Sequence, residues 1–270
     1  MRYLKGTIDL SETRDYPLLR RVLHSNFVTA DQLFEFMRHE YCATSRKAFE
    51  NRVRRLVEHA LLVRHQIREM HRGVVYAISP AGASELIARG EYYAGSPNRA
   101  EVVGGHVQHA LELNGIHLAL KRTGKLVRWT PESDIRSRNE LSSIGYVKDY
   151  DATVQVRIDG HEHRFALEYE RTPKARARYA AIRMHIEAET EFRHFLYIAP
   201  NHDLLAFLRE RFRDCRRPIL FGLYRDVLSD ALELPVMTNQ GVGEARFSTV
   251  LSGSDRIQRQ TGAPSRRAVA

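Results

Sequence analysis

The first third of the chain contains two apolar patterns with helical spacing. The motif Thr29-Ala30-Asp31-Gln32 precedes the first pattern and places a hydroxyl three residues before a glutamine. This is the spacing of a capping box, in which the two side chains satisfy backbone N–H groups at the start of a helix. Farther along, Phe49, Val53 and Leu56 recur on one helix face. We therefore predict one helix from residue 30 and another from Arg46 to His59.

Two strand-like runs and a further helix follow. Leu61 to Ile67 and Gly73 to Ile78 are apolar-rich segments separated by a short polar tip, as expected for a two-stranded ribbon. Ser79-Pro80 then combines an N-cap residue with a proline at the first helical position. Two helices, a ribbon and a closing helix in this order indicate a winged helix-turn-helix over residues 15–90, within an N-terminal domain of residues 1–95.

The polar face of the predicted helix from Arg46 to His59 is strongly basic, as is the tip of the ribbon. Guanidinium and amide groups suit base edges and phosphates in a DNA major groove, and basic groups at the tip suit phosphates or the minor groove. We predict that the following residues bind double-stranded DNA: Arg46, Lys47, Asn51, Arg52, Arg54, Arg55, Arg68 and Arg72. The alternative is a solvated basic surface on a unit that docks a protein.

The rest of the chain alternates helical and strand-like patterns. A helical stretch from His106 to Arg122 precedes strand-like runs at residues 126–129, 150–158 and 164–169, and a strand-helix-strand pattern spans residues 195–224. Such mixed order predicts an α/β (α+β) domain with a mixed sheet over residues 105–252. The domain boundary is expected between Gly90 and Gly105, and residues 253–270 form a basic tail that we expect to be disordered.

Charge and composition narrow the choice of partners. The 270 residues carry a formal net charge of +9 and have a pI near 9.7, which favours polyanions and nucleic acid above all. No apolar run approaches the roughly 20 residues that span a bilayer, and the N-terminus lacks the apolar stretch of a signal peptide, so we expect a cytoplasmic protein without membrane contact. Cys42 and Cys215 are far apart, which supports neither a disulfide framework nor a thiolate zinc site.

Acidic residues gather on two adjacent predicted strands. Alternation along a strand sends Glu168 and Glu170 to the same face. Asp159-Gly160 is the expected hairpin turn that folds the preceding strand back, so that Asp151 stands across from Glu168. Carboxylates that converge in this way suit a hard divalent ion such as Mg²⁺ or Mn²⁺, which activates water for phosphodiester cleavage.

Basic residues follow the acidic ones directly. Thr172-Pro173 is the predicted start of a helix that contains Lys174, so phosphates would meet both cations and a helix N-terminus. The alternative is that the cations of this helix neutralise the two glutamates. His109 is a candidate general base or phosphate contact, with an ordinary structural role as the alternative. Glu132 is a further candidate acid.

Four motifs, in this order and spacing, follow the winged-helix pattern: His109-Ala-Leu-Glu-Leu-Asn114, Trp129-Thr-Pro-Glu132, Asp149-Tyr-Asp-Ala152 and Phe165-Ala-Leu-Glu-Tyr-Glu-Arg-Thr172. On these grounds residues 16–225 resemble the replication-relaxation proteins of plasmids and integrative elements. Those proteins are similar in turn to mobilisation relaxases that have a restriction-endonuclease-like domain.

The resemblance implies a restriction-endonuclease-like core in which Asp151 and Glu168 bind the metal. The residue two positions beyond Glu168 is normally a lysine in nucleases of this fold, and here it is Glu170. An acidic residue at this position is usual in the replication-relaxation family. Lys174, or an arginine of the same predicted helix, is the candidate substitute for the missing lysine.

Three functions stay open on the sequence. The first is a site-specific DNA-binding protein whose nuclease-like domain nicks DNA with Mg²⁺ or Mn²⁺ during plasmid mobilisation or replication. The second is a catalytically inactive winged-helix transcriptional regulator that uses the nuclease-like fold for dimerisation or sensing. The third is an adaptor that joins DNA to replication or transfer machinery. Winged-helix DNA binders are frequently dimers, so a homodimer is an expectation that accompanies each.

Overall fold

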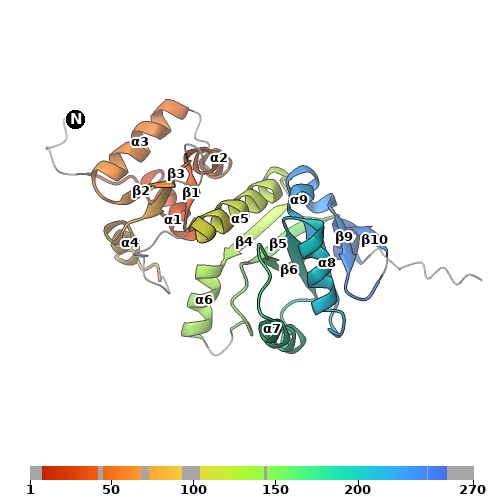
Figure 1. Cartoon of the computed structure of the whole chain (residues 1–270). Coiled ribbons are helices and arrows are strands. Elements are labelled where there is room, and N and C mark those ends of the chain that lie inside the picture. Colours follow the sequence, from red (N-terminus) through yellow and green to blue (C-terminus); the bar gives the residue numbers. More distant parts are fainter. Residues whose placement is uncertain are drawn as a thin grey trace, which may run out of the picture.

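The N-terminal unit combines helices with a small antiparallel sheet. The computed structural model describes residues 8–41, 45–67, 73–92, 104–142, 145–241 and 243–253. The elements of this unit are α1 (Asp15–Ser25), β1 (Val28–Thr29), α2 (Ala30–Tyr41), α3 (Arg46–Glu58), β2 (Leu62–Ile67), β3 (Gly73–Ile78) and α4 (Pro80–Ile87). The strands form a three-stranded sheet in the order β1-β3-β2, with antiparallel pairs (Figure 1).

Local side-chain bonds explain where these helices begin. The capping box before α2 is confirmed, because Gln32 N donates to Thr29 Oγ1 at 3.2 Å and Thr29 N donates to Gln32 Oε1 at 3.3 Å. Ser45 caps α3 by accepting from Ala48 N at 3.3 Å. Ser79 caps α4 as expected, accepting from Gly82 N at 2.9 Å.

The second unit is a mixed α/β domain, which agrees with the predicted class. Its elements are α5 (Gly104–Arg122), β4 (Leu126–Pro131), α6 (Glu132–Leu141), β5 (Ala152–Ile158), β6 (His161–Tyr169), α7 (Arg176–Ala188), β7 (His194–Ala199), α8 (His202–Arg211), β8 (Ile219–Leu223), α9 (Tyr224–Asp230), a 3-10 turn (Ala231–Glu233), β9 (Pro235–Thr238), β10 (Glu244–Arg246) and α10 (Phe247–Ser252). The strands form a seven-stranded sheet in the order β10-β9-β8-β7-β6-β5-β4. Strands β6, β7 and β8 are parallel, and the outer pairs are antiparallel.

Each face of this sheet is covered by its own helices. Helices α5, α9 and α10 pack with strand residues such as Leu167 and Ile198 in one buried cluster. Helices α7 and α8 pack with residues such as Phe195 and Tyr197 in the other. Because successive strand residues point to opposite faces, the alternating apolar residues of β6 and β7 serve both clusters.

The tight turn between β5 and β6 is confirmed. Asp159 and Gly160 both have positive φ, 49° and 80°. A two-residue hairpin turn whose central residues both have positive φ matches the right-handed twist of the flanking strands. The turn fixes the β5–β6 register at Ala152↔Leu167, so the next position outward pairs Asp151 with Glu168.

Helix α5 joins the two units. Asn114 Nδ2 donates to Phe27 O at 2.8 Å, and Gln32 Nε2 donates to Leu111 O at 2.7 Å. Arg122 also pairs with Glu35 at 2.6 Å. Figure 1 shows α5 lying between the N-terminal elements and the large sheet.

One predicted helix boundary is wrong. The helix expected to start at Pro173 begins at Arg176, and Lys174 lies in the irregular segment before it. The Lys174 backbone N–H donates to the hydroxyl of Tyr179 at 3.0 Å, which holds this segment in a non-helical path. The predicted meeting of phosphates with Lys174 inside a helical first turn is therefore corrected.

Several expectations fall on residues outside the described ranges. These are the tip of the ribbon with Arg68 and Arg72, Cys42, most of the predicted domain boundary, and the tail after residue 253. Among the described residues, no helix is both long enough and apolar enough to cross a membrane.

Candidate functional site

Three acidic residues end up in one row at the edge of the sheet. The registers Pro131↔Ala152 and Ala152↔Leu167 align β4, β5 and β6. One position farther outward, Glu132, Asp151 and Glu168 therefore stand side by side, although the first two lie just beyond their strands. Asp151 and Glu168 are two of the three acids that the sequence predicted to converge, and Glu132, a further candidate acid, joins them in this row.

Asp151 is held by the backbone and by a histidine. Its Oδ2 accepts a hydrogen bond from Tyr169 N at 2.7 Å, and its Oδ1 lies 3.3 Å from His109 Nε2. Burial acts to raise the pKa of Asp151, but the hydrogen bond and charge of His109, with the Tyr169 N–H and the charge of Lys148, lower it below its usual value. Burial likewise opposes protonation of His109, and Asp151 more than compensates, so the pKa of His109 is raised. The two side chains form an ion pair when His109 is protonated.

Glu168 is buried beside a lysine that the sequence analysis missed. Burial and the neighbouring charge of Asp151 raise the pKa of Glu168 to about 7, against the opposing effect of Lys148. Lys148 Nζ forms an ion pair with Glu168 Oε1 and also donates to Asp149 O at 3.1 Å. Lys148 lies three residues before Asp151 in a loop. No periodic pattern signals that its side chain reaches Glu168.

Glu170 has its own cation. The carboxylate is buried, and Lys174 Nζ contacts Glu170 Oε2 at 2.6 Å. Burial raises the pKa of Glu170, and Lys174 lowers it in part. Lys174 thus forms an ion pair with the glutamate that replaces the usual lysine, while Glu168 pairs with Lys148. The sequence left open that cations of the following helix neutralise both glutamates, and Lys174 does so for Glu170 from the segment before that helix.

A buried hydroxyl next to the acids has no hydrogen-bond partner in the described part of the chain. Tyr197 is paired with Glu168 across β6 and β7, and its side chain is 1% exposed. Its hydroxyl forms no hydrogen bond with the described residues. An orphaned buried hydroxyl costs free energy unless water or a ligand satisfies it.

A cavity of about 240 Å³ opens between the two units beside Asp151. His24 of α1, His106 and His109 of α5, and Glu132 line it together with Asp151. Glu132 N donates to Asp151 O at 3.2 Å, and the Glu132 side chain pairs with Arg136. Deeper in the unit interface, His117 stacks on Trp129 with ring centroids 4.2 Å apart. Asn114 and His117 thus make structural contacts, with Phe27 and Trp129 respectively. His109, by contrast, contacts the acid Asp151.

The basic residues of α3 differ in their exposure and in their partners. Arg52 and Arg55 pair with the buried carboxylate of Asp15, at 3.0 and 2.9 Å. The side chains of Lys47, Asn51 and Arg54 are exposed.

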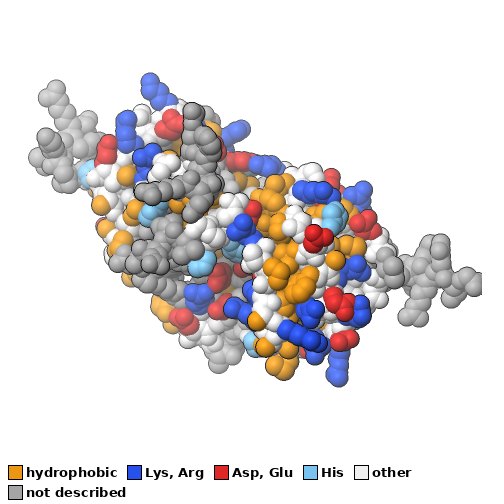
Figure 2. Space-filling model, in the orientation of Figure 1, with side chains coloured by type: hydrophobic (Ala, Val, Ile, Leu, Met, Phe, Trp, Pro, Cys, Tyr) orange, Lys and Arg blue, Asp and Glu red, His pale blue; other side chains and the backbone are white. Residues whose placement is uncertain are grey.

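Within the exposed group, Arg54 donates to Asn51 Oδ1 at 2.9 Å. Arg46 is half-buried and pairs with Asp31 and Glu50, both at 2.7 Å. Figure 2 shows Lys and Arg side chains projecting from the surface over α3.

The described residues contain no group of three or more His, Cys, Asp or Glu side chains placed to hold a metal ion. Mg²⁺ needs fewer protein ligands than three, because it is commonly bound through one or two carboxylates and keeps several waters. The pair of Asp151 and Glu168 supplies two carboxylates, and the orphaned Tyr197 hydroxyl supplies a partner for a bound water. The donor chemistry therefore fits a hydrated Mg²⁺ or Mn²⁺.

No protein-family model matches the chain, and a comparison with curated proteins finds no similar one. Among solved structures, the chain is similar to one described as restriction endonuclease FokI bound to DNA, with 11% identity and a TM-score of 0.26. The similarity covers 83% of this chain and 46% of that one, so this chain spans less than half of that protein's length. A TM-score of this size does not establish a shared fold.

Proposed function

We propose that the chain binds double-stranded DNA through its N-terminal unit, which we interpret as a winged helix-turn-helix. The observation that carries the proposal is the order of the elements, α1-β1-α2-α3-β2-β3, with the sheet order β1-β3-β2 and a basic exposed face on α3. In a helix-turn-helix, the second helix of the pair lies in the major groove. Here that helix is α3.

Lys47, Asn51 and Arg54 are the residues we propose for direct DNA contact. They are exposed on α3, and an amide and a guanidinium in this position suit adenine and guanine edges. Arg46 extends the same surface. We propose that Arg52 and Arg55 act mainly by holding α3 against α1 through Asp15. Arg68 and Arg72 remain predicted contacts at the tip of the ribbon.

The test is fluorescence anisotropy with labelled genomic fragments. The double variant Lys47→Ala/Arg54→Ala should weaken binding and reduce the slope of log K against log salt by about one for each phosphate contact removed. The matched control is Arg213→Ala/Arg225→Ala, which removes two exposed arginines of the second unit. Equal losses in both double variants would contradict a DNA-binding face on α3.

A second candidate function is metal-dependent nicking by the domain of residues 105–252, which we propose to have a restriction-endonuclease-like core. The side-by-side position of Asp151 and Glu168 beside an open cavity favours it. Asp151 and Glu168 would hold Mg²⁺ or Mn²⁺, which supplies charge neutralisation and water activation when bound. His109 orients Asp151 and exchanges a proton at Nε2, while Lys148 takes the neutralising position of the lysine that Glu170 replaces.

Nicking of supercoiled plasmid with Mg²⁺ or Mn²⁺ tests this second function. Wild type should yield open circles, and Asp151→Asn and Glu168→Gln should not, while all three bind DNA equally. The control Glu162→Gln changes an exposed glutamate of β6 that pairs with Arg157. Absence of nicking by wild type with DNA binding intact would favour the inactive regulator, with the second domain used for dimerisation or sensing.

The biological setting is proposed from sequence motifs alone. The resemblance to replication-relaxation proteins suggests a part in processing or controlling the DNA of a mobile element. The homodimer stays a prediction, which the mass of the protein in solution would test.

A further inference from the structure

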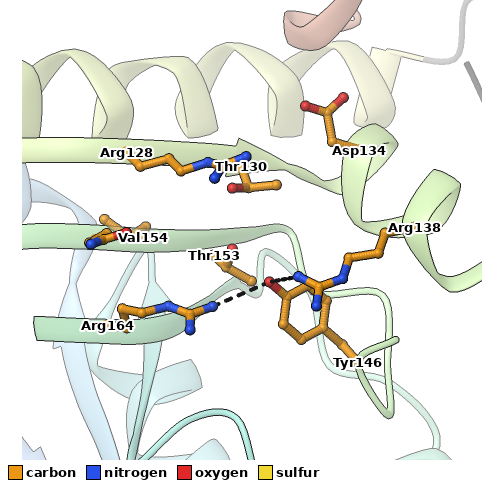
Figure 3. A pocket seen from close by; sticks show the side chains of 9 residues that line it. Arg128, Thr130, Asp134, Arg138, Tyr146, Thr153, Val154 and Arg164 are labelled. Atoms are coloured by element: carbon orange, nitrogen blue, oxygen red, sulfur yellow. Dashed lines mark hydrogen bonds between the residues drawn. The ribbon is translucent and has the colours of Figure 1, made fainter. Parts of the chain in front are cut away.

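A second cavity, of about 500 Å³, lies on the α7 and α8 side of the sheet. Strands β4, β5 and β6 form its floor, and α6 and the loop that carries Tyr146 form its wall (Figure 3). The lining is dominated by polar groups from these elements. Neither the DNA-binding face on α3 nor the row of acids accounts for it.

Three arginines from three different elements face this cavity: Arg128 of β4, Arg138 of α6 and Arg164 of β6. Asp134 is the acidic residue of the lining, so three positive charges against one negative charge give a net charge of +2. Asp134 also lies 3.2 Å from His24 of α1. The cavity therefore carries a local excess of positive charge.

Tyr146 connects two of the arginines. Arg138 Nη1 donates to the Tyr146 hydroxyl at 3.2 Å, and Arg164 Nη2 donates to it at 3.4 Å. Since the hydroxyl oxygen accepts from both guanidiniums, its own hydrogen remains to be donated to a ligand. Figure 3 shows this hydroxyl between the two guanidinium groups.

Arg128 distinguishes a binding site from a structural cluster. Structural contacts explain two of the arginines without a ligand, because Arg138 and Arg164 both donate to Tyr146. Arg164 also lies 3.9 Å from Glu191. Arg128, however, has no hydrogen bond or ion pair with the described residues, although it lines the same cavity. Arg128 is exposed, and a guanidinium without a partner beside two others suits an anion with several oxygen acceptors.

The cavity floor continues toward the acids. Thr130 and Thr153 are paired across β4 and β5 and line the cavity. Two residues farther along the same face of these strands come Glu132 and Asp151, which places the cavity about 7 Å from the acidic row at the rise of a strand. An anionic group in the cavity would thus lie beside the acids.

We propose that Arg128, Arg138, Arg164 and Tyr146 form a binding pocket for the phosphate group of a nucleotide. The nucleotide is either free or part of a nucleic-acid strand that continues to the acidic row. The strand form rests on the proposed DNA binding, whereas the free nucleotide does not. In both forms the guanidiniums donate to phosphate oxygens, and the Tyr146 hydroxyl donates to a further one.

The first experiment is isothermal titration of the full chain with deoxyadenosine 5′-monophosphate, with deoxyadenosine as the ligand that lacks the phosphate. In parallel, anisotropy measures binding of a short labelled single-stranded oligonucleotide. Arg128→Gln should weaken binding of at least one phosphate ligand about tenfold, as expected for the loss of a charge-assisted hydrogen bond. Arg213→Gln, which removes an exposed arginine elsewhere, should leave both affinities unchanged.

The two ligands distinguish the sources of the phosphate. Loss of oligonucleotide affinity alone assigns the pocket to a strand, and loss of mononucleotide affinity alone assigns it to a free nucleotide. Tyr146→Phe keeps the ring and should give a smaller loss in the same assay.

Unchanged affinity for both ligands in Arg128→Gln and Arg164→Gln would overturn the pocket. Deoxyadenosine binding equal to that of the monophosphate would overturn it as well. The pocket and the α3 surface can be judged separately. If Lys47→Ala/Arg54→Ala leaves DNA affinity unchanged while Arg128→Gln weakens phosphate binding, the proposed DNA-binding surface on α3 is rejected and the pocket is retained.

Discussion

At the scale of the residue, the carboxylate of Asp15 binds two arginines of α3 and so draws them away from the exposed face of that helix. Its carboxylate is fully buried and contacts Arg52 Nη1 at 3.0 Å and Arg55 Nη2 at 2.9 Å, and it accepts a bond from Ser11 N at 2.8 Å. Both arginines come from α3, whereas Asp15 begins α1. A buried carboxylate must be paired and hydrogen-bonded to be tolerated. The ion pairs therefore fix α3 against α1.

We expect Asp15→Asn to lower the free energy of unfolding by about 2–3 kcal/mol, because the variant leaves two arginines without their counter-charge. The loss should lie below the roughly 3–5 kcal/mol of a fully buried pair, since both arginines are partly solvated. Urea denaturation measures it. Glu12→Gln, in an exposed pair with Arg89, is the control and should leave stability unchanged. Wild-type stability in Asp15→Asn would mean that the ion pairs do not hold α3.

At the scale of the element, α4 depends on a close approach of backbone to backbone. A Cβ at Gly82 would lie 2.1 Å from Leu61 O and 2.8 Å from Ile78 Cδ1. The Leu61 carbonyl also accepts from Ser79 N at 3.2 Å, so it is not free to move. Glycine at this position lets α4 sit directly on the start of β2.

Gly82→Ala should therefore destabilise the protein by about 1–3 kcal/mol through overpacking, against the usual trend in helices. Alanine ordinarily gains about 0.5–1 kcal/mol over glycine inside a helix. Gly105→Ala in α5 is the matched control, because a Cβ there meets no described atom within 4 Å. Thermal and urea unfolding of both variants give the comparison. Equal effects at the two positions would show that α4 shifts to accept the methyl group.

Local signals predicted elements well. The capping box of Thr29 and Gln32 and the turn at Asp159-Gly160 depend on neighbouring residues, so their effects could be read from the sequence. Helix α6, by contrast, lacks a clear apolar stripe, and its buried apolar residue is Ile135. It was not predicted.

Contacts between distant segments could not be predicted in the same way. The pairing of Lys148 with Glu168 and of Arg52 with Asp15 joins residues from different elements. Residue type and periodicity carry no information about such partners. The sequence thus indicated which acids converge. Which cations pair with these acids depends on the tertiary structure.

On the scale of the whole molecule, α5 makes the two units interdependent. The buried Asn114 donates across the interface to Phe27 O, and His117 packs edge-on against Phe36 of α2 with centroids 4.9 Å apart. His117 also stacks on Trp129 of β4. One histidine therefore touches an element of the N-terminal unit and an element of the large sheet. A change in its charge should loosen both contacts at once.

The pH dependence of stability should reveal this coupling. Burial, with the nearby charges of Arg21, Lys121 and His24, holds the pKa of His117 well below its usual value. A histidine with a depressed pKa stabilises the fold above the pKa of the unfolded chain, and this contribution is lost as pH falls below about 6.5, by up to about 1.4 kcal/mol per pH unit. Urea unfolding followed by the fluorescence of Trp129, the sole tryptophan, measures the loss.

His117→Phe should flatten the decline of stability with falling pH, and His185→Ala, at an exposed histidine of α7, should not. A decline of the same slope in His117→Phe would place the titrating group elsewhere, because a phenyl ring between the units cannot take up the proton.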